Sequence, residues 1–548
     1  MMTLVLAAMM LAQAPDWILV NGNIYTVNPR QPKAQALAVR GDRLVAVGSN
    51  EQVRALAGPN TRVVDAGGRT VLPGLIDAHV HMLGLGQSLA SLDLRELASP
   101  EAAAELVRRE AARRQPGEWI QGRSWDQNKW PGKEFPTHAP LTAAAPNNPV
   151  YLERVDGHAG WVNRKAMELA GLTAATPDPS GGRLIRDSAG QPTGVLIDRA
   201  QGLVGSKIPP LTPQQLKEAL ERAARECARL GLTGVHDAGA GMNVITAYKE
   251  LIEEKRFPLR TYAMIGGAGG TLDEYLKRGP EIGYGDSRLT VRSIKMMVDG
   301  ALGSRGAAML EPYSDEPGNR GLIMLSAGEF ERVCDRALDR GFQVNTHAIG
   351  DRANRLVLDV YEAALLARKE FPRNHRFRIE HAQILASEDI PRLARLGVIA
   401  SMQATHATSD MPWAEARVGP TRVKGAYAWQ SVLKSGARLA NGSDFPVESP
   451  NPLWGLYAAI TRQDHKGNPP NGWFPDQRLS REEALRSFTL DAAYAAFEEN
   501  EKGSLEVGKL ADFVMLSRDV MTIPPADILK TEVLRTVLGG ETVYEGGR

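Results

Sequence analysis

The chain has 548 residues, of which 43% are hydrophobic and 24% are charged, values that are ordinary for a globular protein. Because single hydrophobic cores rarely grow past about 250 to 300 residues, this length predicts more than one domain and excludes a lone small binding module. The 65 basic and 64 acidic residues give a net charge of +1, so no overall field favours nucleic acid or an anionic membrane. We therefore expect a small molecule as the partner.

The first residues resemble a secretion signal. The apolar run Leu4–Leu11 is followed by Ala12-Gln13-Ala14, which matches a cleavage site, although Met1-Met2-Thr3 lacks the usual basic charge. A signal peptide over residues 1–14 would send the protein to a periplasm or out of the cell, whereas an uncleaved tail would leave it cytoplasmic. No apolar run approaches the about 20 residues that span a bilayer, so we expect no transmembrane segment.

Both ends of the remaining chain are predicted to form β-structure. Within residues 15–70, the strand Trp17–Val20 is followed by a turn, and two apolar runs flank the tight turn Gly41-Asp42. Residues 499–548 repeat this pattern with strands such as Asp512–Leu516. We expect the two partial sheets to complete one another.

Residues 71–498 alternate strands with helices. Eight segments have the composition of strands: Asp77–His79, Gly234–Asp237, Tyr262–Ile265, Ile294–Met297, Val344–His347, Arg378–His381, Ile399–Gln403 and Ala440–Asp444. Eight strands interleaved with helices predict an α/β fold, a (β/α)8 TIM-type barrel whose functional residues lie at the carboxyl ends of the strands.

The first two strands of this barrel are separated by roughly 150 residues, far more than a usual βα connection. Residues 83–210 are therefore expected to be an insertion over the barrel mouth that forms much of the substrate pocket. The helix that follows begins at Thr212-Pro213 and places Cys227 on its apolar face. With Cys334 as the second of only 2 cysteines, neither a disulfide framework nor a cysteine zinc site can be built, so any metal needs other ligands.

The end of the first barrel strand carries two histidines one residue apart, His79 and His81. Side chains alternate along an extended strand, so both can face one metal ion. Two histidines at this spacing also occur by chance, and a single strand-end histidine such as His347 or His381 is more often a hydrogen-bonded structural residue. However, four of the 10 histidines fall at predicted strand ends, as does Asp444, and together they indicate a metal centre.

Several motifs along the chain extend this pattern. They are Pro73–His81, Asp299–Ser304, Asn345–Asp351, Ile379–His381, Gly442–Pro446, Gly503–Leu505 and Ala511–Phe513. As a set they resemble the amidohydrolase superfamily, in the branch that includes N-substituted formamide deformylase, over nearly the whole chain. The resemblance implies a (β/α)8 barrel with a small β-sandwich domain built from both chain ends.

The resemblance also implies two divalent metal ions, with zinc expected, although Mn, Fe or Co suit such ligands equally well. His79 and His81 would bind the more buried ion, which Asp444 also contacts. His347 and His381 would bind the more exposed ion.

A bridging ligand is also needed, and Lys295 lies on the fourth strand, where many relatives carry a lysine carbamylated by CO2. A cationic lysine beside two divalent ions is unfavourable, whereas its carbamate offers an anionic oxygen to each ion. The alternative is an ordinary ammonium paired with Asp299, four residues further on, in a site that holds a single metal.

The chemistry expected of this centre is hydrolysis. A metal-bound water is acidified toward a pKa of about 7 and attacks a carbonyl carbon. Asp444 would take the proton of that water as general base and return it to the leaving amine as general acid. The predicted substrate is a small amide or N-substituted formamide with a non-peptide carbon–nitrogen bond. Deamination, cyclic amide opening and ester hydrolysis are alternatives, as is a non-catalytic scaffold that retained the fold.

Three further residues are candidates for substrate contacts. His158 lies in the insertion and resembles a substrate-pocket histidine of this branch, the alternative being a loop histidine that caps the backbone. Gln403 and His406 follow the seventh strand, where they could reach substrate. Weaker candidates are Trp125 and Trp413 as loop aromatics, His236 and Asp237 for orienting a ligand, and Asp351 as a helix cap or a contact. A homo-oligomer is compatible with the sequence.

Overall fold

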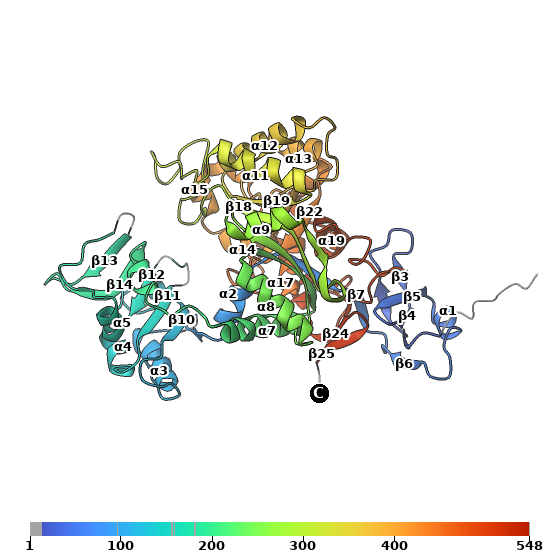
Figure 1. Cartoon of the computed structure of the whole chain (residues 1–548), viewed down its shortest axis with the longest axis horizontal. Coiled ribbons are helices and arrows are strands. Elements are labelled where there is room, and N and C mark those ends of the chain that lie inside the picture. The colour runs from blue at the N-terminus through green and yellow to red at the C-terminus, as the bar shows by residue number, and fades with distance from the viewer. Residues whose placement is uncertain (1–13, 96, 155–156, 158, 180–181, 547–548) are drawn as a thin grey trace, which may run out of the picture. The chain divides into compact units, whose positions relative to one another are not determined.

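The computed structural model describes residues 14–95, 97–154, 157, 159–179 and 182–546 (Figure 1). They form two compact units, one within residues 1–82 and 224–548 and the other within residues 83–223. Within the described ranges, every helix is too short or too polar to cross a bilayer.

Eight parallel strands form a barrel in the first unit. In order around the barrel they are β8 (Leu75–Val80), β15 (Leu232–Ala240), β16 (Arg260–Gly266), β18 (Leu289–Met297), β19 (Gln343–Ala348), β20 (Arg378–His381), β21 (Ile399–Gln403) and β22 (Leu439–Gly442). The first and last strands meet where the backbone N–H of Asp444 donates to the carbonyl of His79 at 2.8 Å. Every residue of β8, β19, β20, β21 and β22 is buried, as in other parallel sheets covered on both faces. The predicted barrel fold is confirmed.

Helices alternate with these strands along the chain. They are α7 (Pro213–Arg229), α8 (Met242–Glu253), α9 (Gly270–Arg278), α11 (Ala327–Arg340), α12 (Asp351–Leu366), α13 (Ile390–Leu396), α14 (Ala404–Asp410), α15 (Ala414–Arg422), α16 (Trp429–Lys434), α17 (Pro452–Thr461), α18 (Arg481–Ser487) and α19 (Leu490–Ala495). A capping box of Ser326 and Glu329 begins α11, and Gly341, with a φ of 74°, ends it. Cys227 of α7 is buried, as predicted from its helical spacing.

Two further sheets of the first unit form a β-sandwich, one from the N-terminal end alone and one from strands of both chain ends. One contains β1 (Trp17–Val20), β4 (Ala36–Arg40), β5 (Arg43–Gly48) and β6 (Arg62–Asp65), and the other contains β2 (Asn23–Tyr25), β3 (Lys33–Ala34), β7 (Thr70–Pro73), β23 (Phe513–Leu516), β24 (Val533–Leu538) and β25 (Glu541–Glu545). β23 pairs antiparallel with β7, with Phe513 opposite Pro73. Side chains of both sheets, including Trp17, Leu37 and Val537, share one core. Because β7 leads directly into β8, this β-sandwich also holds the start of the first barrel strand.

Residues 83–223 form the second unit around a sheet of their own. Its strands are β9 (Leu92–Asp93), β10 (Ile120–Trp125), β11 (Val150–Arg154), β12 (Ala159–Val162), β13 (Gly182–Arg186) and β14 (Pro192–Asp198), and its helices include α3 (Pro100–Ala111), α4 (Ala139–Ala144), α5 (Arg164–Leu169) and α6 (Gln201–Gly205). Trp125 is fully buried, stacks on Trp130 with ring centroids 5.8 Å apart, and donates from its indole N–H to Leu152 O at 2.8 Å. Trp125 is therefore a core residue of this unit rather than a substrate contact.

Candidate metal centre

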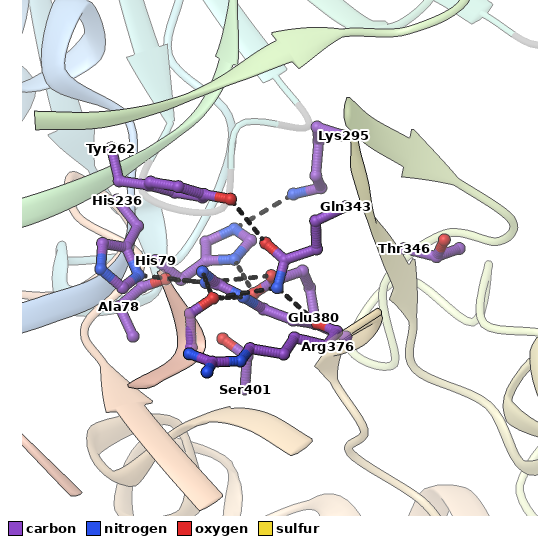
Figure 2. Close-up of polar contacts among 12 residues, drawn as sticks. Ala78, His79, His236, Tyr262, Lys295, Gln343, Thr346, Arg376, Glu380 and Ser401 are labelled. Atoms are coloured by element: carbon purple, nitrogen blue, oxygen red, sulfur yellow. Dashed lines mark hydrogen bonds and ion pairs between the residues drawn. The ribbon is translucent and has the colours of Figure 1, made fainter. Parts of the chain in front are cut away.

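Six ligand candidates gather at the carboxyl ends of the barrel strands. They are His79 and His81 at the end of β8, Lys295 on β18, His347 on β19, His381 on β20 and Asp444 after β22. The ring centroids of His79 and His381 are 4.8 Å apart, and those of His347 and His381 are 4.6 Å apart. Lys295 Nζ lies 3.1 Å from His79 Nε2 (Figure 2), and Asp444 Oδ1 lies 3.2 Å from His81 Nε2. The barrel thus brings residues from distant parts of the chain into one cluster.

Three of these side chains offer the closest set of ligand atoms. One atom each from His79, His381 and Asp444 lies within 4.8 Å of the others, and all three residues are buried. Imidazole nitrogens and a carboxylate are donors that zinc and other first-row divalent metals accept in proteins. The donor set therefore fits a metal ion.

A neighbouring acceptor fixes one ring nitrogen of two histidines. The contacts are Glu380 Oε2 to His79 Nδ1 (2.6 Å) and Gln403 Oε1 to His381 Nδ1 (2.8 Å). Metal-binding histidines usually donate their second N–H to a carboxylate or carbonyl in this way. His347 Nε2 lies 3.4 Å from Asp299 Oδ1 but has no hydrogen-bond partner among the described residues. The rings of His79 and His381 keep their opposite nitrogens for an ion, and the buried Nε2 of His347 is unpartnered among the described residues, which is a second reason why the residues fit a metal.

Burial sets the protonation states of the cluster. It lowers the pKa of His79 to about 4, with a further contribution from the nearby Lys295, and lowers the pKa of His381 well below its usual range. Burial also lowers the pKa of Lys295. Burial alone would raise the pKa of Asp444, but the adjacent His81 and His79 bring it well below its usual value. Near neutral pH His79 and His381 are therefore neutral imidazoles and Asp444 is a carboxylate, the forms that bind metal.

The sequence model of the amidohydrolase family matches residues 62–544, a range that includes the whole cluster and all eight barrel strands. The chain belongs to the amidohydrolase family. It is accordingly a hydrolase that acts on carbon–nitrogen bonds, as the sequence motifs predict.

Three relatives match this amidohydrolase almost from end to end. It is 35% identical over 542 residues to Protein LONG AFTER FAR-RED 3 of Arabidopsis thaliana, covering 96% of this chain and 91% of the relative. It is 32% identical over 534 residues to the putative amidohydrolase YtcJ of Bacillus subtilis (96% and 98%) and 29% identical over 555 residues to the N-substituted formamide deformylase of Arthrobacter pascens (98% and 99%). The likeness therefore extends through the sandwich, the barrel and the second unit.

Solved structures with the same fold include metal-dependent hydrolases. An uncharacterized metal-dependent hydrolase from Pyrococcus horikoshii matches with a TM-score of 0.78 and 29% identity, covering 93% of this chain and 99% of that one. Atrazine chlorohydrolase TrzN from Arthrobacter aurescens, solved in complex with zinc, matches with a TM-score of 0.53 and 16% identity, covering 96% and 95%. At that identity, the second match concerns the fold alone.

The three predicted substrate residues have different places in this amidohydrolase. His406 of α14 lies at the cluster, with Nε2 3.8 Å from Asp444 Oδ2. Gln403, whose carbonyl oxygen holds a histidine ring, is 2% exposed and donates from Nε2 to Ser401 O at 3.3 Å. The buried position and the contacts of Gln403 indicate that it orients a metal ligand and does not touch the substrate. His158 lies outside the described residues.

The ion pair of Lys295 with Asp299, the alternative raised by the sequence, does not form. Asp299 lies beyond the end of β18, where its carboxylate accepts from the backbone N–H groups of Ala308 (2.8 Å), Ile349 (3.0 Å) and Gly350 (2.8 Å). It thereby ties the loop after β18 to the turn after β19. Lys295 instead donates to a histidine of the cluster.

Asp77 holds the first and last barrel strands together beside the cluster. Its Oδ1 accepts from the Ser443 N–H (2.9 Å) and its Oδ2 from the Ser443 hydroxyl (2.6 Å), and burial raises the pKa of Asp77 to about 7. Sequence reasoning gave no role to Asp77 or to Glu380. For Asp77 the available signal was an acidic residue inside a largely apolar strand, since such residues are rarely buried without a partner.

The weaker candidates hold the surrounding backbone. His236 Nδ1 accepts from Arg378 (3.0 Å), Asp237 accepts from the Met82 N–H (3.0 Å) and the Tyr248 hydroxyl (2.7 Å), and Asp351 accepts from the Leu310 N–H (2.7 Å). Asp237 therefore fixes the chain directly after the second histidine of β8. Trp413 is half-buried, with the Arg417 guanidinium 5.6 Å from its ring centroid.

Proposed function

We propose that the protein hydrolyses amides or N-substituted formamides of small molecules with the help of two divalent metal ions, zinc being the first candidate. The observation that carries the proposal is a buried cluster of histidines. His79 and His381 are each held by a neighbouring acceptor and keep one nitrogen for an ion, and the Nε2 of His347 has no hydrogen-bond partner among the described residues. The end-to-end match to the N-substituted formamide deformylase of Arthrobacter pascens supports the substrate class.

The residues divide into two groups around these ions. His79, His81 and Asp444 would hold one ion. His347 and His381 would hold the other. Bound there, the ions would lower the pKa of a coordinated water toward about 7 and polarise the substrate carbonyl.

Asp444 is the group that would move the proton. Its pKa lies well below the usual value, so it is an acceptor near neutral pH, and it stands between the histidines of β8 and His406. We infer that it takes the proton of the attacking water and returns it to the amine nitrogen as the carbon–nitrogen bond breaks. The products are a carboxylic acid and an amine.

Lys295 is the proposed bridging ligand in its carbamylated form. Its ammonium would lose one proton, and the neutral amine nitrogen would then bond to the carbon of CO2 and lose a second proton, which turns a cationic side chain into an anionic one. The reaction needs a neutral amine, and burial lowers the pKa of Lys295 in that direction. Two nearby divalent ions favour the anionic product.

The test is a hydrolysis screen with metal control. Protein stripped with a chelator and then reloaded with Zn2+ is offered N-formyl amines, N-acyl amines and cyclic amides. We expect about two ions per chain and turnover of at least one amide class that is lost on stripping and regained on reloading. If the fully metal-loaded protein hydrolysed an ester or deaminated a base but cleaved no amide, its activity would be assigned to another reaction of the superfamily. Loaded protein without any turnover would favour a scaffold role.

A further inference from the structure

A charged pair lies inside the barrel beneath His79. Glu380 and Arg378, two residues apart on β20, are both fully buried. Glu380 Oε2 is 2.6 Å from His79 Nδ1 (Figure 2). Glu380 Oε1 has no hydrogen-bond partner among the described residues and lies 3.9 Å from Arg378 Nη1. The histidine, the carboxylate and the guanidinium form a row that leads from the cluster into the barrel.

Other elements fix the guanidinium of Arg378 in place. Its Nη1 donates to His236 Nδ1 of β15 at 3.0 Å, and its Nε donates to the carbonyl of Ala495, the last residue of α19, at 3.1 Å. Nη2 donates to the same carbonyl, and the guanidinium lies 5.3 Å from the ring centroid of Tyr262 on β16. The positive charge therefore has a set position at a fixed distance from Glu380.

Such a pair is not explained by stability alone. Removing two charges from water is unfavourable, and buried ion pairs are often no more stabilising than apolar residues of the same volume. The geometry nevertheless serves His79 directly. An ionised carboxylate only accepts hydrogen bonds, so at 2.6 Å it places the imidazole hydrogen on Nδ1 and leaves the Nε2 lone pair for the cluster.

We propose that Glu380 is a positioning residue for His79 and that Arg378 is its counter-charge. Together they hold the His79 ring in the tautomer and orientation that bind a divalent ion. The inference rests on the proposed function in assuming that an ion binds at this ring, but it makes no assumption about the substrate.

Metal affinity tests the proposal without any substrate. Glu380→Ala removes the acceptor, Glu380→Gln keeps an acceptor oxygen without the charge, and Thr346→Ser is the control. Thr346 is buried on the neighbouring strand β19, but its hydroxyl pairs with the Tyr361 hydroxyl (2.7 Å) and it stands apart from the row in Figure 2. Each protein is titrated with Zn2+ against a competing chelator and with Co2+ in the visible range, and urea unfolding of the metal-free forms checks folding.

We expect Glu380→Ala to raise the Kd for metal about 10- to 100-fold and Glu380→Gln to raise it less, both with an altered cobalt spectrum. Thr346→Ser should keep the wild-type Kd and spectrum. A folded Glu380→Ala protein with the wild-type Kd and spectrum would overturn the proposal, and where that variant does not fold, the same result for Glu380→Gln would do so. Wild-type protein that binds metal but cleaves no amide would refute the proposed function and leave these measurements intact.

Discussion

The groups that hold the histidine rings differ in charge, and this difference has a chemical consequence. Glu380 is a carboxylate, whereas Gln403 is a neutral amide. A hydrogen bond to a carboxylate makes an imidazole more basic and a better ligand than a bond to an amide does. His79 is the ring so strengthened, whereas His381 is not, and the two belong to different ions in the proposed arrangement. The ion at His79 would then have the stronger histidine ligand.

Asp444→Asn separates proton transfer from metal binding. Asparagine keeps an oxygen near His81 but accepts no proton, so we expect most of the metal to remain and turnover to fall about 10²- to 10⁴-fold. Steady-state kinetics together with metal analysis measure both effects. Glu448→Gln is the matched control, because that carboxylate lies four residues further along the same loop. Activity that survives in Asp444→Asn would refute the assignment of the proton acceptor.

Lys295→Met tests the bridging ligand. Methionine has a similar length but cannot form a carbamate, so we expect metal content to fall from about two ions per chain to one at most, with loss of turnover. Native mass spectrometry of the wild-type protein, prepared with bicarbonate present, should show the added mass of one CO2. If Lys295 were unmodified in wild-type protein with its full metal content, the bridging carbamate would be refuted and Lys295 would act as an amine.

The ligand candidates could be predicted from the sequence because they stand at strand ends, where histidines in a chain with only 10 of them attract notice. The residues that orient these ligands could not be predicted from the sequence. Glu380 lies 301 positions from its partner in the chain and Asp77 lies 366 positions from Ser443. Such contacts depend on barrel closure and register, and no local pattern encodes them.

At the scale of the elements, the junction of β8 with β22 leaves no room for a side chain at Gly442. A Cβ there would lie 2.6 Å from Asp77 Oδ1 and 2.7 Å from the backbone nitrogen of His79. The barrel therefore closes around a glycine directly below the metal cluster, and the spacing of these two strands sets the distance between the histidines of β8 and Asp444.

Gly442→Ala should separate the two strands. We expect a loss of about 1 to 3 kcal/mol in the free energy of unfolding, the usual cost of overpacking, together with weaker metal binding. Urea unfolding and the chelator titration measure the two effects. Gly202→Ala in α6 is the control, since a Cβ there meets nothing within 4 Å, and it should stay within about 0.5 kcal/mol of wild type. Wild-type metal affinity in Gly442→Ala would show that the junction does not control the site.

The eight barrel strands were predictable because continuous apolar runs bounded by turns are typical of parallel strands buried on both faces. The second unit was predictable only as an insertion. Its strands β13 and β14 carry glycine, proline and charged residues and lie in a sheet whose pairings are mostly antiparallel. The long apolar runs that mark the barrel strands are therefore missing from these two strands.

At the scale of the whole molecule, one buried ion pair joins the barrel to the sandwich within the first unit. Arg260 at the start of β16 donates to both carboxylate oxygens of Asp512, which directly precedes β23, at 2.7 and 3.0 Å. Asp512 also accepts from the Gly539 N–H at 2.7 Å, in the turn after β24. The pair thus connects a barrel strand with the part of the sandwich that the end of the chain supplies.

This pair should make the molecule sensitive to acid. Burial alone would raise the pKa of Asp512, but Arg260 brings it below its usual value. A carboxyl whose folded pKa is depressed stabilises the protein fully above the unfolded pKa of about 3.9, and this contribution is lost as the pH falls through the folded pKa.

Asp512→Asn leaves a buried guanidinium without its charge partner, so we expect the free energy of unfolding to fall by about 3 to 5 kcal/mol near neutral pH. Urea unfolding at about pH 6 and about pH 3 measures the difference in the free energy of unfolding between the variant and the wild type. We expect this difference to be smaller at the lower pH. Asp527→Asn, which breaks the exposed pair with Lys530, should cost about 1 kcal/mol or less. If the difference in the free energy of unfolding between Asp512→Asn and the wild type were equal at both pH values, the charge of Asp512 would not stabilise the junction of barrel and sandwich.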